Sequence, residues 1–378
     1  MSPIIRIAEA ANRRREAGHK IVSLTTGEPD FPTPSHIVEA AHAAATSGQT
    51  RYTPTAGTDA LRGAIADRAG AAADQVIVGT GAKQVIFNAM MATVSPGDEV
   101  IVTAPFWSSY VDIVRICGGA PIIVDTAPTA FKLTPEALAQ AITPRTRWLF
   151  INTPSNPSGT VLSPADIIGL ADILRSHRHV AILSDQIYHE ISYVPFTSFR
   201  DAAPDLTART LTVDGVSKAY SMTGWRIGWG IGNPTLIRAM SVVQAQSTSG
   251  ASSVSQAAAL AALTGPQHML AERRAVFQAR GQRLRRGLEA TGMLTFGDAD
   301  GAFYLFPSCE ALLGMTGNGQ RIRTDTDFCE YILQAANVAT VPGSAFGTPG
   351  HLRLSYSYAE DELDRACNLI LGACLALT

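Results

Sequence analysis

The sequence has few cysteines, no long apolar run and little lysine, and the first two of these shortages each exclude a class of protein. The five cysteines are scattered without paired spacing, which argues against a disulfide framework or a zinc site and fits a reducing compartment. No window approaches the length of a membrane-spanning helix, and the N-terminus lacks the pattern of a secretion signal. We therefore expect a cytoplasmic protein that binds neither a membrane nor a metal.

Clusters of positive charge are also scarce. The formal net charge is -2. The only tight basic run, residues 13–15, lies in an amphipathic helical pattern, and its three arginines form the solvated face of that helix. Because phosphate backbones are bound by clustered cations, nucleic acid is excluded as the main partner. With 378 residues, 46% of them hydrophobic, the chain is long enough for two domains and is expected to act on small molecules.

The four lysines stand beside twenty-six arginines, so a chain that uses arginine for surface charge has kept lysine in very few places. One of them, Lys218, follows a buried strand in the run DGVSKAYSMTGWRIGW (214–229). Arginine stays protonated, whereas a desolvated lysine can lose its proton and attack a carbonyl carbon to form a Schiff base. Lys218 is thus a candidate anchor for an aldehyde cofactor, although on rarity alone a surface lysine is an equally good interpretation.

Short apolar runs alternate with helical segments through the first two thirds of the chain. Seven runs are typical of strands buried on both faces: 75–78, 99–102, 121–124, 147–151, 180–183, 210–213 and 227–231. Helix openers with proline near the first turn, at 134–136 and 163–165, fit crossovers over a parallel sheet. This pattern predicts a wound, mostly parallel α/β sheet.

The composition changes after Gly232. Helices are expected over 234–246 and 272–288, and then a smaller α+β unit with strands at 302–306 and 351–355. It would also contain a helix near 328–335 and a closing helix from Glu360 onward, with a loop at 315–320.

Ligands collect beyond the carboxyl ends of strands in such sheets, and polar residues gather there in this sequence. The turn GTGAKQ (79–84) opens a helix whose free N–H groups favour a phosphate, although an ordinary strand-to-helix turn explains it equally well. Asp185 could hold a proton on a pyridine nitrogen or cap a helix, and Tyr188 would point from the same side. Arg226 could pair with a phosphate or with a surface carboxylate.

Together these residues resemble the class I pyridoxal-phosphate-dependent aminotransferases of fold type I, and among them most closely the bacterial aspartate aminotransferases. The resemblance runs from about Leu24 to the last helix. Seven ordered motifs carry it: LTTGEPDF (24–31), RYTPTAG (51–57), APFW (104–107), NTPSNPSG (152–159), SDQIY (184–188), SKAYSMTGWRIG (217–228) and HLRLSY (351–356). It implies a large cofactor-binding domain at 36–274 and a small domain made of 1–35 and 275–378.

The resemblance also implies a role for each motif residue. Lys218 would form the Schiff base with pyridoxal 5'-phosphate and then move the substrate proton. For the cofactor ring, the resemblance implies contacts of Asp185 with the pyridine nitrogen, of Tyr188 and Asn156 with the ring oxygen, and of Trp107 with the ring face. The phosphate would be bound by Arg226 and by the Gly81 and Ala82 amides. Tyr52 would reach the phosphate that is bound in the neighbouring subunit. Arg353 would bind the substrate α-carboxylate with the help of the Gly27 backbone N–H and Asn156. Without the resemblance, Trp107 and Tyr52 would be core or interface aromatics and Gly27 a turn.

The implied reaction moves an amino group between an L-amino acid and a 2-oxoacid, in a homodimer with shared active sites. Aspartate and glutamate are the expected substrates, with Lys83 as the cation for the distal carboxylate, although Lys83 could equally be a solvated first-turn residue. Aromatic or aliphatic amino acids and prephenate are alternatives.

Two further hypotheses fit the same motifs. A pyridoxal-phosphate lyase or a cyclopropane-forming synthase would keep Lys218, Asp185 and Arg353 without completing transamination. A regulatory module would carry a DNA-binding domain before the fold, for which we expect no room ahead of Leu24.

Overall fold

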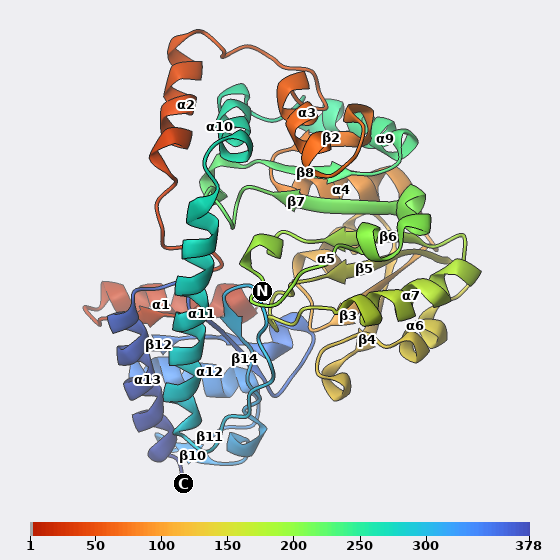
Figure 1. The fold of residues 1–378 in the computed structure, drawn as a ribbon. Helices are drawn as coiled ribbons and strands as arrows, with labels where there is room; N and C mark the ends of the chain where they lie inside the picture. Colours follow the sequence, from red (N-terminus) through yellow and green to blue (C-terminus); the bar gives the residue numbers. More distant parts are fainter. Residues whose placement is uncertain (1–2) are drawn as a thin grey trace.

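A seven-stranded sheet forms the centre of the larger part of the molecule in the computed structural model, which describes residues 3–378 and side chains from residue 6 onward (Figure 1). The strand order is β2-β8-β7-β6-β5-β3-β4. The strands are β2 (Val76–Gly79), β3 (Glu99–Ala104), β4 (Ala120–Asp125), β5 (Thr146–Asn152), β6 (Ala181–Asp185), β7 (Thr210–Gly215) and β8 (Gly228–Ile231). All seven predicted strands are therefore present, within two residues at each end.

Six of the seven strands run in the same direction, and β8 alone is antiparallel to its neighbours β2 and β7. The parallel pairs place the carboxyl ends of β5 and β6 side by side, with Asn152 opposite Asp185. The predicted mostly parallel α/β architecture is thus confirmed, and the polar residues after these strands meet at one edge of the sheet.

Helices cover both faces of the sheet because the strand side chains alternate between two apolar layers. Val100 and Val102 pack in the layer that contains α4 and α9, whereas Ile101 points into the layer that contains α6 and α7. No helix among residues 3–378 is long and apolar enough to cross a membrane. The helices of this larger part are α2 (Ser35–Thr46), α3 (Asp59–Arg68), α4 (Ala82–Thr93), α5 (Ser109–Ile116), α6 (Pro135–Ala141), α7 (Pro164–Ser176), α8 (Phe199–Ala202), α9 (Pro234–Ser247) and α10 (Ser253–Thr264).

Two crossover helices begin where their local sequence predicts. The Ser163 hydroxyl accepts a hydrogen bond from the Asp166 amide at the start of α7, and Pro164 occupies the first turn. Thr134 accepts one from the Ala137 amide at the start of α6. Such caps satisfy amides that a helix leaves without partners, so these starts are encoded locally.

A second apolar core unites the beginning and the end of the chain. Ile7 and Val22 share it with Phe328, Val338 and Ile370. Its strands β13 (Val341–Pro342), β14 (Leu352–Ser355) and β9 (Tyr304–Leu305) form an antiparallel sheet, and β1 (Val22–Ser23) pairs with β12 (Val338–Ala339). Its helices are α1 (Pro3–Glu16), α12 (Asp325–Ala336) and α13 (Glu360–Leu375).

Two details of this region differ from the sequence expectation. The strand expected at 302–306 is reduced to β9, because Ala302 takes a left-handed backbone conformation with φ of 59° that ends the extended run. The loop expected at 315–320 contains a short hairpin of β10 (Thr316–Gly317) and β11 (Gln320–Arg321).

The long helix α11 (His268–Glu289) joins the two parts of the molecule (Figure 1). Leu270 packs with the core of α3 and α10, whereas Phe277 and Leu284 pack in the second core. The expected boundary after residue 274 falls inside this continuous helix. The division at residues 35 and 274 stays a prediction, and residues 1 and 2 lie outside the described part.

Candidate active site

A pocket of about 670 Å³ lies where the carboxyl ends of the parallel strands face the second core. It collects residues from distant parts of the chain, because strand order and sequence order differ. Ten of the twelve predicted site residues line it: Gly27, Ala82, Lys83, Trp107, Asn156, Asp185, Tyr188, Lys218, Arg226 and Arg353. Gly81 lies next to it as the cap of α4, and Tyr52 does not line it.

Lys218 is partly buried in the pocket, three residues after β7. Its Nζ donates a hydrogen bond to the Gly27 carbonyl at 2.6 Å and lies 5.9 Å from the centre of the Tyr188 ring. Burial lowers the pKa of Lys218 to about 8, although the nearby Glu28 carboxylate opposes the shift. A large fraction of this amine is therefore uncharged near pH 8, as a nucleophilic lysine requires.

Lys218 contacts the carbonyl group of Gly27. The predicted role of Gly27 was a different one, in which its backbone N–H binds the substrate carboxylate. Gly27 also lies close to the Tyr304 hydroxyl, since a Cβ atom at this position would approach that oxygen to 2.9 Å. The tight packing explains why glycine occupies this turn.

Asp185 ends β6 and is buried, with 3% of its surface exposed. Its Oδ2 accepts a hydrogen bond from the Tyr110 hydroxyl at 2.5 Å, and its Oδ1 accepts one from the Ile187 amide at 3.2 Å. Burial raises the pKa of Asp185 to about 6, while the Tyr110 hydrogen bond acts in the opposite direction. No helix begins directly after Asp185, so it is not a helix cap, the alternative that its residue type allowed.

Tyr110 was not predicted as a site residue. It lies on α5, is buried, and burial raises its pKa well above the usual value for a phenol, so that it stays a hydrogen-bond donor to Asp185. Its position three residues after Trp107 was the only available signal, and that spacing does not distinguish a site residue from a core aromatic.

Tyr188 and Tyr304 form a buried pair of phenols. Their hydroxyl oxygens are 2.9 Å apart, and burial raises the pKa of both groups. Tyr304 also was not predicted, because it belongs to a strand pattern that reads as apolar core. One hydroxyl of the pair donates to the other, so the pair leaves one uncommitted O–H beside the pocket that Lys218 lines.

Arg353, on β14, is 6% exposed and is held from three sides. Its Nη1 donates to Asn156 Oδ1 at 3.0 Å and its Nη2 donates to the Thr25 carbonyl at 2.7 Å. The guanidinium carbon lies 4.6 Å from the Tyr304 ring centre and 5.0 Å from that of Phe346. Its buried Nε has no hydrogen-bond partner within residues 3–378. This arginine is therefore oriented by its neighbours at the pocket wall, where an anion can meet its charge.

The start of α4 and Arg226 surround a narrow backbone cradle. Gly81 caps α4 with φ of 83°, and its missing side chain leaves room for the Arg226 guanidinium. A Cβ atom on Gly228 would collide with the Ala82 backbone. The exposed Arg226 donates to the Thr223 carbonyl at 2.8 Å. Amides at a helix start together with an arginine suit a phosphate.

Lys83 and Trp107 lie together at the pocket wall. Lys83 Nζ is 4.7 Å from the Trp107 ring centre. Partial burial and the nearby Arg226 charge lower the pKa of Lys83, so a bound anion would be favourable here. Tyr52, in contrast, is 97% exposed on the segment between α2 and α3 and contacts none of these groups.

The sheet and this pocket define the class of protein: a fold type I protein in which a lysine amine and a buried carboxylate line the same pocket. The family model of class I and II aminotransferases matches residues 19–370, and the chain belongs to this family. It is an aminotransferase, as predicted, from a family that works with pyridoxal 5'-phosphate.

Named relatives agree with this assignment. The aspartate aminotransferase of Rhizobium meliloti (strain 1021) is 49% identical, with 99% of this chain and 94% of the relative covered. A probable aspartate/prephenate aminotransferase of Rickettsia bellii is 42% identical, covering 100% and 97%. These names favour an aminotransferase over the lyase and regulatory hypotheses.

Solved structures are similar over the whole chain. The crystal structure of the Rhizobium meliloti aspartate aminotransferase superposes with a TM-score of 0.98 at 47% identity, covering 100% of this chain and 97% of the other. That of Thermus thermophilus with maleate gives 0.91 at 36% identity, covering 99% and 97%. The predicted fold type I is confirmed.

Proposed function

We propose that this enzyme transfers the amino group between aspartate or glutamate and a 2-oxoacid, using pyridoxal 5'-phosphate on Lys218. One observation carries the proposal: a lysine of lowered pKa, a buried aspartate and an oriented arginine line the same pocket. The lysine would react with the cofactor aldehyde, the aspartate would contact the cofactor's ring nitrogen, and the arginine would bind the substrate carboxylate.

The residues present fit the cofactor. The start of α4 at Gly81 and Ala82 would offer backbone amides to a phosphate beside the Arg226 guanidinium, and Gly228 lets β8 pack closely against these residues. Trp107 offers a ring face to a flat heterocycle, while Asn156 and Tyr188 offer hydrogen-bond donors to a ring oxygen. When bound, this group would supply an electron sink for the substrate α-carbon.

The protein's own residues would control the proton positions. Asp185, held by Tyr110, would keep a proton on the ring nitrogen, and its burial would make that ion pair strong. Lys218, once released as a neutral amine, would be the base at the substrate α-carbon. The Gly27 carbonyl at 2.6 Å would hold Lys218 on the substrate side of the pocket.

Arg353 would bind the substrate α-carboxylate. The hydrogen bonds to Asn156 and Thr25 fix the guanidinium plane at the pocket wall. A planar two-point contact would orient the substrate as well as bind it.

Lys83 is proposed to bind the distal carboxylate of aspartate or glutamate. Two observations support it: its position at the pocket wall over Trp107, and the maleate of the Thermus thermophilus structure, since maleate is a four-carbon dicarboxylate. A second candidate substrate is prephenate, which the names of the Rickettsia relatives favour.

We further propose a homodimer in which Tyr52 reaches the phosphate site of the neighbouring subunit. Its support is an aromatic side chain that is 97% exposed and belongs to one of the family motifs. A cytoplasmic location is proposed because all five cysteines are free.

An absorbance scan of the cofactor-loaded enzyme during addition of single amino acids tests the proposal. Full conversion of the cofactor band by aspartate and glutamate, reversed by oxaloacetate or 2-oxoglutarate, is expected. The Lys83→Met variant should lose this response to dicarboxylates and keep any response to aromatic donors. Conversion by aromatic or aliphatic donors alone would overturn the dicarboxylate assignment.

A further inference from the structure

Strand β7 has one apolar face and one polar face. Leu211 and Val213 pack in the layer of α4 and α9, whereas the buried Thr212 and Asp214 point to the opposite side. A cavity of about 510 Å³ lies on that side, between the strands, α3, α10 and the chain after β6. Ile187 lines both this cavity and the candidate active site, so the two lie back to back.

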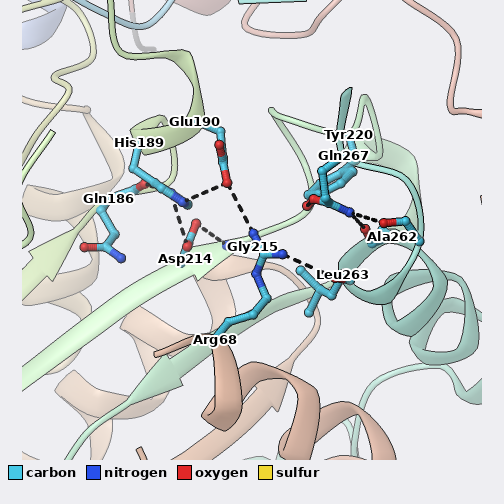
Figure 2. Close-up of polar contacts among 11 residues, drawn as sticks. Arg68, Gln186, His189, Glu190, Asp214, Gly215, Tyr220, Ala262, Leu263 and Gln267 are labelled. Carbon is cyan, nitrogen blue, oxygen red and sulfur yellow. Dashed lines mark hydrogen bonds and ion pairs between the residues drawn. The ribbon is translucent and has the colours of Figure 1, made fainter. Parts of the chain in front are cut away.

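A chain of charged groups crosses this rear cavity, with His189 at its centre (Figure 2). His189 Nδ1 is 3.3 Å from Asp214 Oδ2, and its Nε2 is 3.4 Å from Glu190 Oε1. The same Glu190 oxygen accepts a hydrogen bond from Arg68 Nη2 at 3.3 Å. Arg68 also donates to the Leu263 carbonyl, which connects the chain of charges to α10.

The His189–Asp214 contact joins two chain segments that carry residues of the candidate active site. His189 directly follows Tyr188, and Asp214 is four residues before Lys218. The ladder of β6 and β7 ends one residue after Asp185, where the Gln186 amide donates to the Val213 carbonyl at 3.0 Å. Beyond that point, the His189–Asp214 contact connects the segment after β6 with the end of β7.

The charge state of His189 makes this connection strong. Burial alone would lower its pKa, but the Asp214 and Glu190 carboxylates outweigh burial and raise the pKa of His189 to about 10. Arg68 and Arg274 act on Glu190, and Arg200 and Asp201 line the same cavity. The ring is therefore an imidazolium at neutral pH that lies between two carboxylates, and its Nδ1 is also 3.1 Å from the Gln186 carbonyl oxygen.

We propose that His189 is a positioning residue for the aminotransferase reaction: as an imidazolium it holds segment 185–188 against segment 214–218 from behind the sheet and balances the charge of Asp214. It does not line the candidate active site, so it acts through Asp185, Tyr188 and Lys218. Asp214 is close enough to Asp185 to raise its pKa, so an unbalanced Asp214 would disturb the ring-nitrogen contact. The inference rests on the proposed function.

A pH titration of the visible absorbance of the cofactor-loaded enzyme tests this role. Loss of a nearby positive charge raises the pKa of neighbouring groups, so His189→Gln should move the midpoint to higher pH by about half a unit. We also expect kcat to fall by about fivefold with KM nearly unchanged, because orientation rather than binding is lost. His179→Gln, which removes an exposed histidine that contacts the Thr143 carbonyl and the His177 ring and does not line either cavity, is the matched control and should leave both unchanged.

A second variant separates charge balance from mere structural support. In His189→Gln with Asp214→Asn, neither charge remains, and the midpoint should return to that of the unmodified enzyme. In the cofactor-free His189→Gln protein, amide hydrogen exchange at residues 186–190 should be faster, because the tie is lost.

An unshifted midpoint in His189→Gln, or a double variant that stays shifted, would overturn the proposal. If His189→Gln does not fold, His189→Lys retains the charge and should titrate like the unmodified enzyme; a shifted midpoint there would also overturn it. An unmodified enzyme without a cofactor band would instead contradict the proposed function.

Discussion

At the scale of single residues, burial determines the properties of the site. Lys218 and Asp185 have opposite charges, and burial moves both toward neutrality, with pKa values of about 8 and about 6. Arg353 stays charged and is instead held by hydrogen bonds and two aromatic rings. The pocket therefore combines two adjustable groups with one permanent cation.

Arg353→Lys should lower kcat/KM for the amino donor by about a hundredfold, because an ammonium cannot make the planar two-point contact. Steady-state kinetics with aspartate measure this loss. Arg283→Lys, in an exposed pair with Asp364, is the control and should change little. A loss below threefold would contradict carboxylate binding by Arg353.

Asp185 should destabilise the cofactor-free protein at neutral pH. The pKa of Asp185 is about 6 in the folded protein and 3.8 in its ordinary state. Below pH 3.8 the carboxyl is protonated in both the folded and the unfolded protein and costs no stability. As pH rises through about 6 the buried carboxyl ionises, and the loss of stability becomes complete. Asp185→Asn should therefore raise the free energy of unfolding, by about 1 kcal/mol more at pH 8 than at pH 5. Denaturant unfolding at both pH values measures this, and a gain independent of pH would contradict it.

At the scale of elements, the start of α4 and strand β8 together form the proposed phosphate cradle. β8 is the one strand of the seven-stranded sheet that runs antiparallel to its neighbours, and its first residue, Gly228, packs directly against Ala82 at the start of α4. The phosphate cradle thus depends on close backbone contact between two elements far apart in sequence.

Gly228→Ala should weaken cofactor binding by tenfold or more, because the new methyl group would push the Ala82 amide away from the cradle. Equilibrium binding of pyridoxal 5'-phosphate to the cofactor-free protein measures the effect. Gly63→Ala, where nothing lies within 4 Å of the added Cβ, should bind the cofactor normally. Unchanged affinity in Gly228→Ala would exclude this cradle as the phosphate site.

At the scale of the whole molecule, the pocket lies between the parallel sheet and the second core, and each contributes part of it. Arg353 comes from the second core, and Lys218 and Asp185 from the sheet. Tyr52 is exposed in the single chain, and in the proposed dimer it would contact the phosphate site of the neighbouring subunit.

Hybrid dimers test that proposal. Lys218→Ala and Tyr52→Phe subunits should each be impaired alone, but a mixed dimer contains one site with Lys218 from one subunit and Tyr52 from the other. Activity and cofactor affinity at that site should match the unmodified enzyme. Mixed dimers without any recovery would contradict a shared site.

The sequence by itself determined the strands, the capped crossover helices and most of the pocket residues, because periodicity, capping and ordered motifs are local signals. Lys218, Asp185 and Arg353 were all predicted, and all line one pocket. Their roles and the two-domain division stay predictions, since α11 passes through the expected boundary.

Only the tertiary structure decided which partners those residues have. Tyr110 is 75 positions from Asp185, and Tyr304 is 116 from Tyr188, so no local pattern connects them. The Gly27 carbonyl contact with Lys218 and the His189–Asp214 pair likewise depend on how separate strands and turns meet. The physical reason is that burial and charge proximity, which set the pKa of each site group, arise only when distant segments pack together.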